Sequence, residues 1–301
     1  TWFQVIRDCS ARPYHARIAP AAHPMTRRAL FACLPLALAL SACQHAATPA
    51  ASDATPTPRM LLLGEVHDSA AGHAARAALL RKELEAGWRP AIAMEQFDTV
   101  QQPLLDAAMR DCTTADCVVD KVVTGKSGWT WAYYKPLIAL ALEYKLPLLA
   151  ANLSRTDASK VVKDGFAASL PSDVIARYGL DAPPEDVMGP QETEVRDSHC
   201  GALPEPMVAP MARAQIARDV VMALTMQAHA QHGVVLIAGN GHVRKDIAVP
   251  YWLRRDGLAP RAVGFLEPAS DAAPFDAVER IPATERPDPC AGFKAPTPPK
   301  G

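Results

Sequence analysis

A short segment near residue 65 carries several side chains that can titrate or bind a metal. It reads LLLGEVHDSAAGH, and after three leucines it places Glu65, His67, Asp68 and His73 within nine residues. Histidines and carboxylates act as general acids and bases or as ligands of divalent cations. The chemistry expected here is acid–base catalysis or metal binding, which requires rigid elements that hold these side chains together.

Further polar groups follow later apolar runs in the same way. After AIAM, LPLLA, VVLIAG and AVGFL come Glu95, Asn152, Asn240 with His242, and Glu267. A turn or capping role explains one such group. Because ligands of open parallel sheets bind beyond the carboxyl ends of the strands, the set together predicts a functional cleft. Its candidate catalytic or metal-binding residues are Glu65, His67, Glu95 and His242.

A long apolar helix is expected to add Arg218 to this cleft. Gln215, Arg218, Asp219 and Met222 share one stripe at helical spacing. If Arg218 faces inward, its guanidinium can bind a carboxylate such as Glu65 or Glu95. The helical period alone slightly favours the alternative, a solvated Arg218–Asp219 face.

The elements that position these residues alternate along the chain. Near-continuous apolar runs are typical of strands buried on both faces, and they occur at 60–64, 91–94, 146–151, 234–238 and 262–266. Alanine- and leucine-rich helical stretches occur at 71–86, 103–110, 134–144 and 210–232. This order predicts an α/β fold, with a mainly parallel sheet flanked by helices. The proline-containing stretch 170–210 is expected to be an inserted, partly helical, lid-like region within a single domain.

Composition sets the broad class of the protein. The 301 residues, 49% of them hydrophobic, can bury a core as one large domain or two small ones. A formal net charge of -1, without a run of lysines and arginines, gives no reason to expect nucleic acid as a partner.

Residues 25–42 have the features of a secretory signal peptide. A basic start precedes an apolar run, and LSAC closes the segment with Cys43, which resembles a bacterial lipobox. An N-terminal membrane anchor is the alternative, but a run of about a dozen apolar residues is short for the ~20 that span a bilayer. We expect Cys43 to carry a lipid such as palmitate.

The lipobox divides the rest of the chain. We expect a flexible tether at 43–59, which is small, polar and proline-rich, and a folded domain at 60–301. Residues 1–24 precede Met25 and are expected not to belong to the native protein. Because Gln44 rather than an aspartate follows Cys43, we expect an outer-membrane lipoprotein that faces the periplasm or the cell surface.

Four cysteines remain in the predicted mature domain. An even number in an oxidising compartment favours disulfides. The local pair Cys112–Cys117 in DCTTADC leaves Cys200–Cys290 to hold the C-terminal tail. Zinc binding is the alternative, but these spacings do not match a zinc ribbon.

Several of these motifs, taken in order, resemble one family. LLLGEVHDSAAGH, AMEQF, GWTWAYYKPLIALALEYKLPLLAANLSR, AQIARDVVMA and VVLIAGNGHVRKDIAVPYWLRR are similar to segments of the ChaN-like haem-binding lipoproteins, whose superfamily includes the Tiki proteases and the erythromycin esterases. The resemblance implies haem as ligand, a role in haem or iron acquisition, and a homodimer that holds two haems face to face. It also implies iron ligation by a tyrosine with histidine help.

Candidate haem ligands follow from that resemblance. Tyr134 in WAYYKP is the first choice and Tyr133 the second, because tyrosinate suits ferric iron; a buried aromatic at a helix start is the alternative for Tyr134. His199 in DSHCG is the assisting candidate, although it stands beside Cys200. His73, His229 and His232 rank lower, and the last two are expected on a solvated helix end.

The hydrolases of the superfamily supply a rival reading. In it His67 is the base, oriented by Glu65 or Glu95, and His242 with Arg218 holds an oxyanion or a metal. His67, Glu95 and His242 are also candidate ligands of a divalent cation such as Mn²⁺ or Zn²⁺. No nucleophilic serine or cysteine is placed near them, so hydrolysis would use an activated water.

Overall fold

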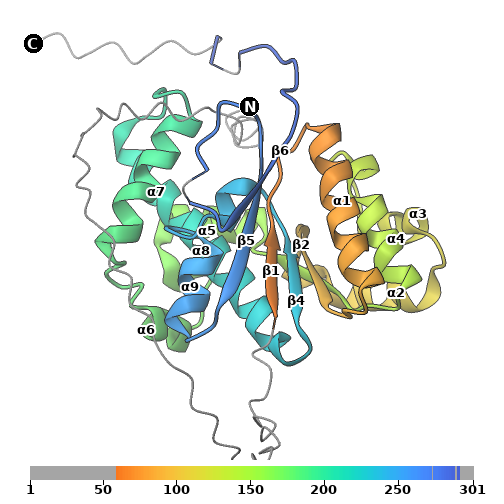
Figure 1. The fold of residues 1–301 in the computed structure, drawn as a ribbon. Helices are drawn as coiled ribbons and strands as arrows, with labels where there is room; N and C mark the ends of the chain where they lie inside the picture. The colour runs from red at the N-terminus through yellow and green to blue at the C-terminus, as the bar shows by residue number, and fades with distance from the viewer. Residues whose placement is uncertain (1–58, 273, 289, 292–301) are drawn as a thin grey trace, which may run out of the picture. The chain divides into compact units, whose positions relative to one another are not determined.

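A parallel sheet forms the centre of the computed structural model of this chain (Figure 1), which describes residues 59–272, 274–288 and 290–291. Within the described residues the sheet has six strands, in the order β3-β2-β4-β1-β5-β6. These are β1 (Met60–Leu63), β2 (Ala91–Asp98), β3 (Leu148–Asn152), β4 (Val234–Ile237), β5 (Pro260–Leu266) and β6 (Ala277–Arg280). All neighbouring strands are parallel.

The apolar runs form strands because both faces of the sheet are covered. Along β1, Met60 and Leu62 pack into one hydrophobic cluster, and Leu61 and Leu63 pack into another on the opposite face. The predicted α/β class and the five predicted strands are therefore confirmed. The sixth strand, β6, was not among the predicted strands; it has no apolar run, and its residues are half-buried or exposed.

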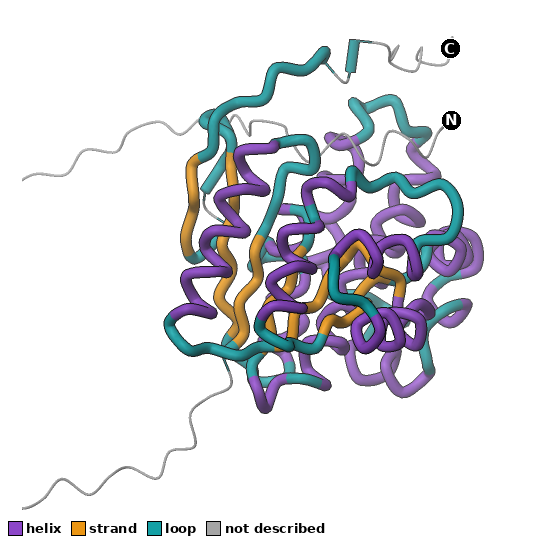
Figure 2. Tube along the Cα trace, turned by 90° about the vertical axis from the view of Figure 1, so that its right-hand side faces the viewer, coloured by secondary structure: helices purple, strands orange, loops and turns teal. Residues whose placement is uncertain are grey.

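Two helical layers cover the sheet. One contains α1 (Ala70–Glu85), α2 (Gln102–Asp111), α3 (Ala115–Val122) and α4 (Lys135–Glu143). The other contains α5 (Arg155–Asp164), α6 (Ser172–Tyr178), α7 (Glu185–Ser198), α8 (Glu205–Ala228) and α9 (Val249–Arg255). Figure 1 shows the two groups on opposite sides of the strands, and Figure 2 views the sheet from the side of the first group.

The predicted helices are present with shifted boundaries. The predicted helix 210–232 corresponds to α8, which begins earlier at Glu205 and contains Pro210. The expected insert at 170–210 contains α6 and α7. Val195 of α7 packs against Val208 and Met211 of α8, so this region forms part of a helical layer.

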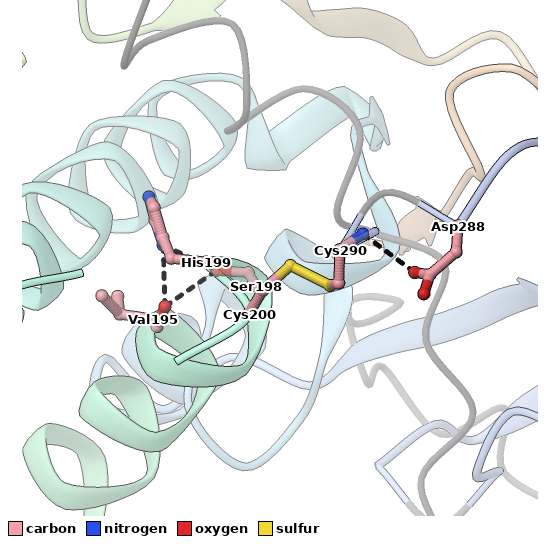
Figure 3. The surroundings of a disulfide bond; sticks show 6 residues. All are labelled: Val195, Ser198, His199, Cys200, Asp288 and Cys290. Atoms are coloured by element: carbon pink, nitrogen blue, oxygen red, sulfur yellow. Dashed lines mark hydrogen bonds between the residues drawn. A yellow bond between two sulfur atoms is a disulfide. The ribbon is translucent and has the colours of Figure 1, made fainter. Parts of the chain in front are cut away.

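Both predicted disulfides are present. Cys112, which directly follows α2, bonds Cys117 in α3. Cys200 after α7 bonds Cys290 near the end of the described chain (Figure 3). The predicted signal peptide, Cys43 and the tether lie outside the described residues.

No helix in the described part of the chain has the length and apolar character needed to cross a bilayer.

Candidate functional site

The loop between β1 and α1 brings a buried carboxylate against several partners. Glu65 Oε1 lies 2.5 Å from His67 Nδ1 and accepts a hydrogen bond of 2.7 Å from the Tyr134 hydroxyl. Arg76 on α1 donates to the other oxygen of Glu65. His73 lies beside Arg76, 2.9 Å from its Nη2, and its Nε2 lies 3.0 Å from the His67 carbonyl.

These contacts keep Glu65 ionised. Burial disfavours its charge, but Arg76 and His67 outweigh that cost and hold the pKa of Glu65 well below its usual range. Burial also lowers the pKa of His67, yet the hydrogen bond and charge of Glu65 raise it overall. The His67 Nδ1–H therefore points at Glu65 and its Nε2 is directed elsewhere.

A second histidine–carboxylate pair lies at the neighbouring strand ends. His242, in the turn after β4, places Nδ1 2.7 Å from Oδ1 of Asp219 on α8, and its Nε2 is 3.6 Å from Glu95 Oε1. Glu95, near the end of β2, accepts a hydrogen bond of 2.8 Å from the Gly239 backbone N–H. This arrangement gives His242 a carboxylate on each side.

The charges around His242 shift the pKa values of this second pair. Burial lowers the pKa of His242, but the charges of Glu95 and Asp219 raise it to about 9. Burial raises the pKa of Asp219 to about 6, against the opposing effect of His242. His242 is therefore a cation at neutral pH.

The two pairs meet at Gly239. A Cβ atom there would lie 3.4 Å from His67 Cε1 and 3.8 Å from Glu95 Oε2, so the backbone runs against both side chains. The predicted convergence of Glu65, His67, Glu95 and His242 at one sheet edge is what the structure contains. These four residues with Asp219 are called the strand-end site below.

Arg218 faces this edge and is not part of a solvated stripe. Its Nη1 donates to Asn152 Oδ1 at 2.5 Å and to the Leu153 carbonyl at 2.8 Å. It does not bind Glu65 or Glu95 directly, although the charges of Glu95 and Asp98 attract it. The slightly favoured interpretation of a solvated face is thus wrong: Asp219 is buried and Arg218 is half-buried.

Two other rim residues have structural contacts. Asn240 donates to the Phe265 carbonyl and accepts from the Phe265 N–H, which joins the β4 turn to β5. Glu267 accepts hydrogen bonds from Arg286 in the C-terminal tail.

Residues 129–134, called the aromatic segment below, lie beside His67 and His73. Trp129 contacts His67 edge-on with ring centroids 5.1 Å apart, and Tyr133 stacks on His73 at 4.6 Å. Trp129, Trp131 and Tyr133 are half-buried, whereas Tyr134 is 1% exposed. Burial and the charge of Glu65 raise the pKa of Tyr134 far above its usual value.

His199 lies apart from the tyrosines. It is buried at the end of α7, where its Nδ1 bonds the Val195 carbonyl at 2.7 Å (Figure 3). Tyr134 packs in the hydrophobic cluster on the opposite face of the sheet. The structure thus does not bring His199 and the tyrosines together within one subunit. His229 and His232 are exposed at the end of α8, as expected.

A divalent-metal site is not supported. In the part of the chain that the structure describes, no group of three His, Cys, Asp or Glu side chains has an arrangement that can hold a metal ion. The prediction of His67, Glu95 and His242 as ligands of a divalent cation is therefore not supported within the described residues.

Sequence reasoning did not assign roles to Arg76 or Asp219. Arg76 follows His73 by three residues on α1, which places both on one helix face. This spacing could have indicated from the sequence that Arg76 accompanies His73. Asp219 was identified on the Arg218 stripe, but nothing in the sequence paired it with His242.

Comparison with known proteins identifies the chain's relatives. The family model described as "Haem-binding uptake, Tiki superfamily, ChaN" matches residues 53–253. A structure of cofacial haem binding to ChaN of Campylobacter jejuni shares the fold at TM-score 0.60 and 19% identity, covering 74% of this chain and 87% of that one. A mutant erythromycin esterase EreC in its open conformation aligns at TM-score 0.43 and 14% identity, over 71% of each chain. No curated protein matches. Since the family model covers more than half of its residues, this chain belongs to the ChaN family of haem-binding uptake proteins in the Tiki superfamily.

Proposed function

We propose that this protein binds haem at the aromatic segment beside the strand-end site, through Tyr133, and serves in haem or iron acquisition. The observation that carries the proposal is the state of the Tyr133 side chain. It is half-buried, stacks on His73, and within the described residues its hydroxyl has no hydrogen-bond partner. Family membership supplies the ligand class.

Tyr133 suits iron ligation better than Tyr134 does. A tyrosine that ligates ferric iron must lose its hydroxyl proton and reach the metal. The Tyr134 hydroxyl is buried and donates to Glu65, and the charge of Glu65 opposes formation of the phenolate. Using Tyr134 would break a buried contact network, whereas using Tyr133 leaves that network intact.

The surrounding side chains fit a flat aromatic ligand. Trp129 and Trp131 expose part of their rings beside Tyr133 and offer apolar surface. His73 supports Tyr133 by stacking, but both of its nitrogens already have partners, so we do not propose it as an iron ligand. When bound, haem would supply a ferric iron, for which a phenolate oxygen is a suitable ligand.

Titration with haemin tests this proposal. We expect saturable binding with the absorption spectrum of tyrosinate-ligated ferric haem, and we expect Tyr133→Phe to abolish that spectrum. Tyr134→Phe is the matched control and should retain it. A tyrosinate spectrum that survives Tyr133→Phe and disappears with Tyr134→Phe would reverse the assignment, and the absence of saturable binding would refute haem binding itself.

We further propose that the protein is an exported lipoprotein of the outer membrane that dimerises around two haems. The lipobox-like LSAC at Cys43 and Gln44 support anchoring, the two disulfides suit an oxidising compartment, and the cofacial haems of Campylobacter jejuni ChaN support a dimer. Labelling with radioactive palmitate that is lost in Cys43→Ala tests the anchor. Sedimentation with and without haemin tests the dimer.

Hydrolysis without a metal is the second candidate function. His67 and His242 each bind a carboxylate through Nδ1, and both lie beside Glu95. With Glu65 orienting His67 as a base and cationic His242 stabilising an oxyanion, an activated water can attack an ester or amide. Assays on a panel of ester and peptide substrates, with His67→Asn as the inactive variant, test this candidate. Equal turnover by wild type and His67→Asn would exclude it.

A further inference from the structure

The C-terminal tail crosses from the sheet to α7 past the loop that carries Glu65 and His67. Residues 281–288 and Cys290 are called the strap below. At its start, the Ile281 N–H bonds the Leu266 carbonyl at 3.0 Å, and its side chain is 3% exposed. A Cβ atom on Gly72 would lie 2.9 Å from Ile281 Cδ1, so Ile281 lies directly on the first turn of α1.

Arg286 in the middle of the strap bridges two carboxylates. Its Nε and Nη2 donate to the two oxygens of Asp68, each at 2.8 Å. Its Nη1 and Nη2 donate to the two oxygens of Glu267 at 2.9 and 2.7 Å. Asp68 is adjacent to His67 in the loop, and Glu267 follows β5, so the guanidinium ties this loop to the end of the sheet.

The far end of the strap is covalently fixed. Cys290 bonds Cys200, which follows α7, and the Cys290 N–H donates to Asp288 at 2.8 Å (Figure 3). Asp68 has 53% of its side chain exposed, so its pair with Arg286 is weak in isolation. Fixed ends on both sides of Arg286 reduce the entropy lost when the pair forms.

From these contacts we infer that Arg286 is a positioning residue that holds the β1–α1 loop, and with it His67, in place, and that the Cys200–Cys290 disulfide keeps Arg286 there. This inference goes beyond the proposed function, because it concerns how the site is built and not what it binds. An oxidising compartment holds the strap closed. A dithiol reductant transfers two electrons and two protons to the disulfide, forms two thiols and is itself oxidised to a disulfide.

Hydrogen–deuterium exchange of the loop is the first test. The Ser69 N–H donates to the Val66 carbonyl, and the His73 N–H donates to the Ser69 carbonyl. The Gly72 N–H donates to the Ser69 hydroxyl. Exchange of these three amides reports opening of this loop. We expect the segment 64–73 to exchange about three- to tenfold faster in Arg286→Ala and in the double variant Cys200→Ser/Cys290→Ser. Segment 91–98 of β2 is the internal reference and should be unchanged.

The titration of His67 followed by NMR separates positioning from general destabilisation. In the folded protein Glu65, Glu95, His242 and His73 surround His67. If Arg286→Ala loosens the loop, the His67–Glu65 contact weakens and the raised pKa of His67 falls toward its ordinary value. Arg286→Lys should restore it only in part, because an ammonium cannot bridge two carboxylates in the same geometry.

Matched variants make the test decisive. Glu285→Gln changes an exposed strap residue next to Arg286 and should behave as wild type. In a Cys112→Ser/Cys117→Ser background, dithiothreitol reduces only Cys200–Cys290 among the described cysteines and should reproduce the faster exchange. Unchanged exchange and an unchanged His67 pKa in Arg286→Ala overturn the inference. If Arg286→Ala does not fold, Arg286→Lys and the reduced protein decide by the same readouts. No readout uses haem, so this inference and the proposed function fail separately.

Discussion

Glu65→Gln removes a buried negative charge that holds His67, Arg76 and Tyr134. Arg76 has no exposed surface, and Glu65 is 1% exposed. Glutamine keeps the shape but presents an amide that cannot neutralise Arg76. Removing one partner of a buried ion pair costs about 3–5 kcal/mol, because the other charge stays buried and unpaired.

That cost can be read as a melting temperature. For a domain of this size, each kcal/mol corresponds to about 2–4 °C, so Glu65→Gln should melt roughly 6–20 °C below wild type. At neutral pH, Glu65→Gln should lose the full stabilisation that the ionised Glu65 provides. The folded-state pKa of Glu65 is depressed, so its stabilisation is present above its ordinary value of 4.5 and is lost only as the pH falls through the lower folded-state value.

Urea denaturation followed by circular dichroism measures the free energy of unfolding. Glu143→Gln is the matched control, since Glu143 also pairs with an arginine through both oxygens, but at the surface with 49% of its side chain exposed. We expect the control to lose about 0–1 kcal/mol. If Glu65→Gln costs no more than Glu143→Gln, the reasoning about a buried, charged network at this edge is refuted.

Three other substitutions probe the site and its supports. The pKa of His242 is raised from 6.5 to about 9, so its contribution to stability is complete below pH 6.5 and is lost as the pH rises through about 9. In urea denaturation between neutral and alkaline pH, the unfolding free energy of His242→Asn should therefore depend less on pH than that of wild type. Gly64→Ala would place a Cβ atom 2.1 Å from Asn240 Oδ1 and should lower the free energy of unfolding by about 1–3 kcal/mol, whereas an unchanged value would show that Asn240 moves freely. Cys112→Ser/Cys117→Ser removes a disulfide between residues five apart. By the chain-entropy estimate it should cost about 2 kcal/mol of unfolding free energy relative to oxidised wild type, and an unchanged free energy would contradict that estimate.

The sheet was predictable because its central strands are buried on both faces. Runs such as MLLL and VVLI have no alternation of polar residues, and each becomes a strand flanked by two hydrophobic clusters. β6, with the sequence AVER, was not predictable in this way. It lies at the edge of the sheet beside β5, with two exposed residues at its end.

The strand-end rule also located most of the site. His67 follows β1 and His242 follows β4, whereas Glu95 lies within the second half of β2, and the three meet at one edge of the sheet. What the rule does not give is the partner of each group. Tyr134 reaches Glu65 across 69 positions of sequence, and Asp219 reaches His242 across 23.

Sequence patterns also could not predict which face of α8 is buried or where the helices of the second layer lie. The helical period puts Arg218 and Asp219 on one stripe, but only packing of α8 against β3 and β4 decides that this stripe is buried. Likewise His199 directly follows α7, a helix whose Val195 packs on α8. Neither contact is local in sequence.

A crystal structure of the protein with haemin tests the central claim most directly. We predict haem seated against Trp129 and Trp131, the Tyr133 oxygen on iron, and the hydrogen bond from Tyr134 to Glu65 preserved. Haem bound away from the aromatic segment, or ligated by Tyr134 with its contact to Glu65 broken, would contradict this account.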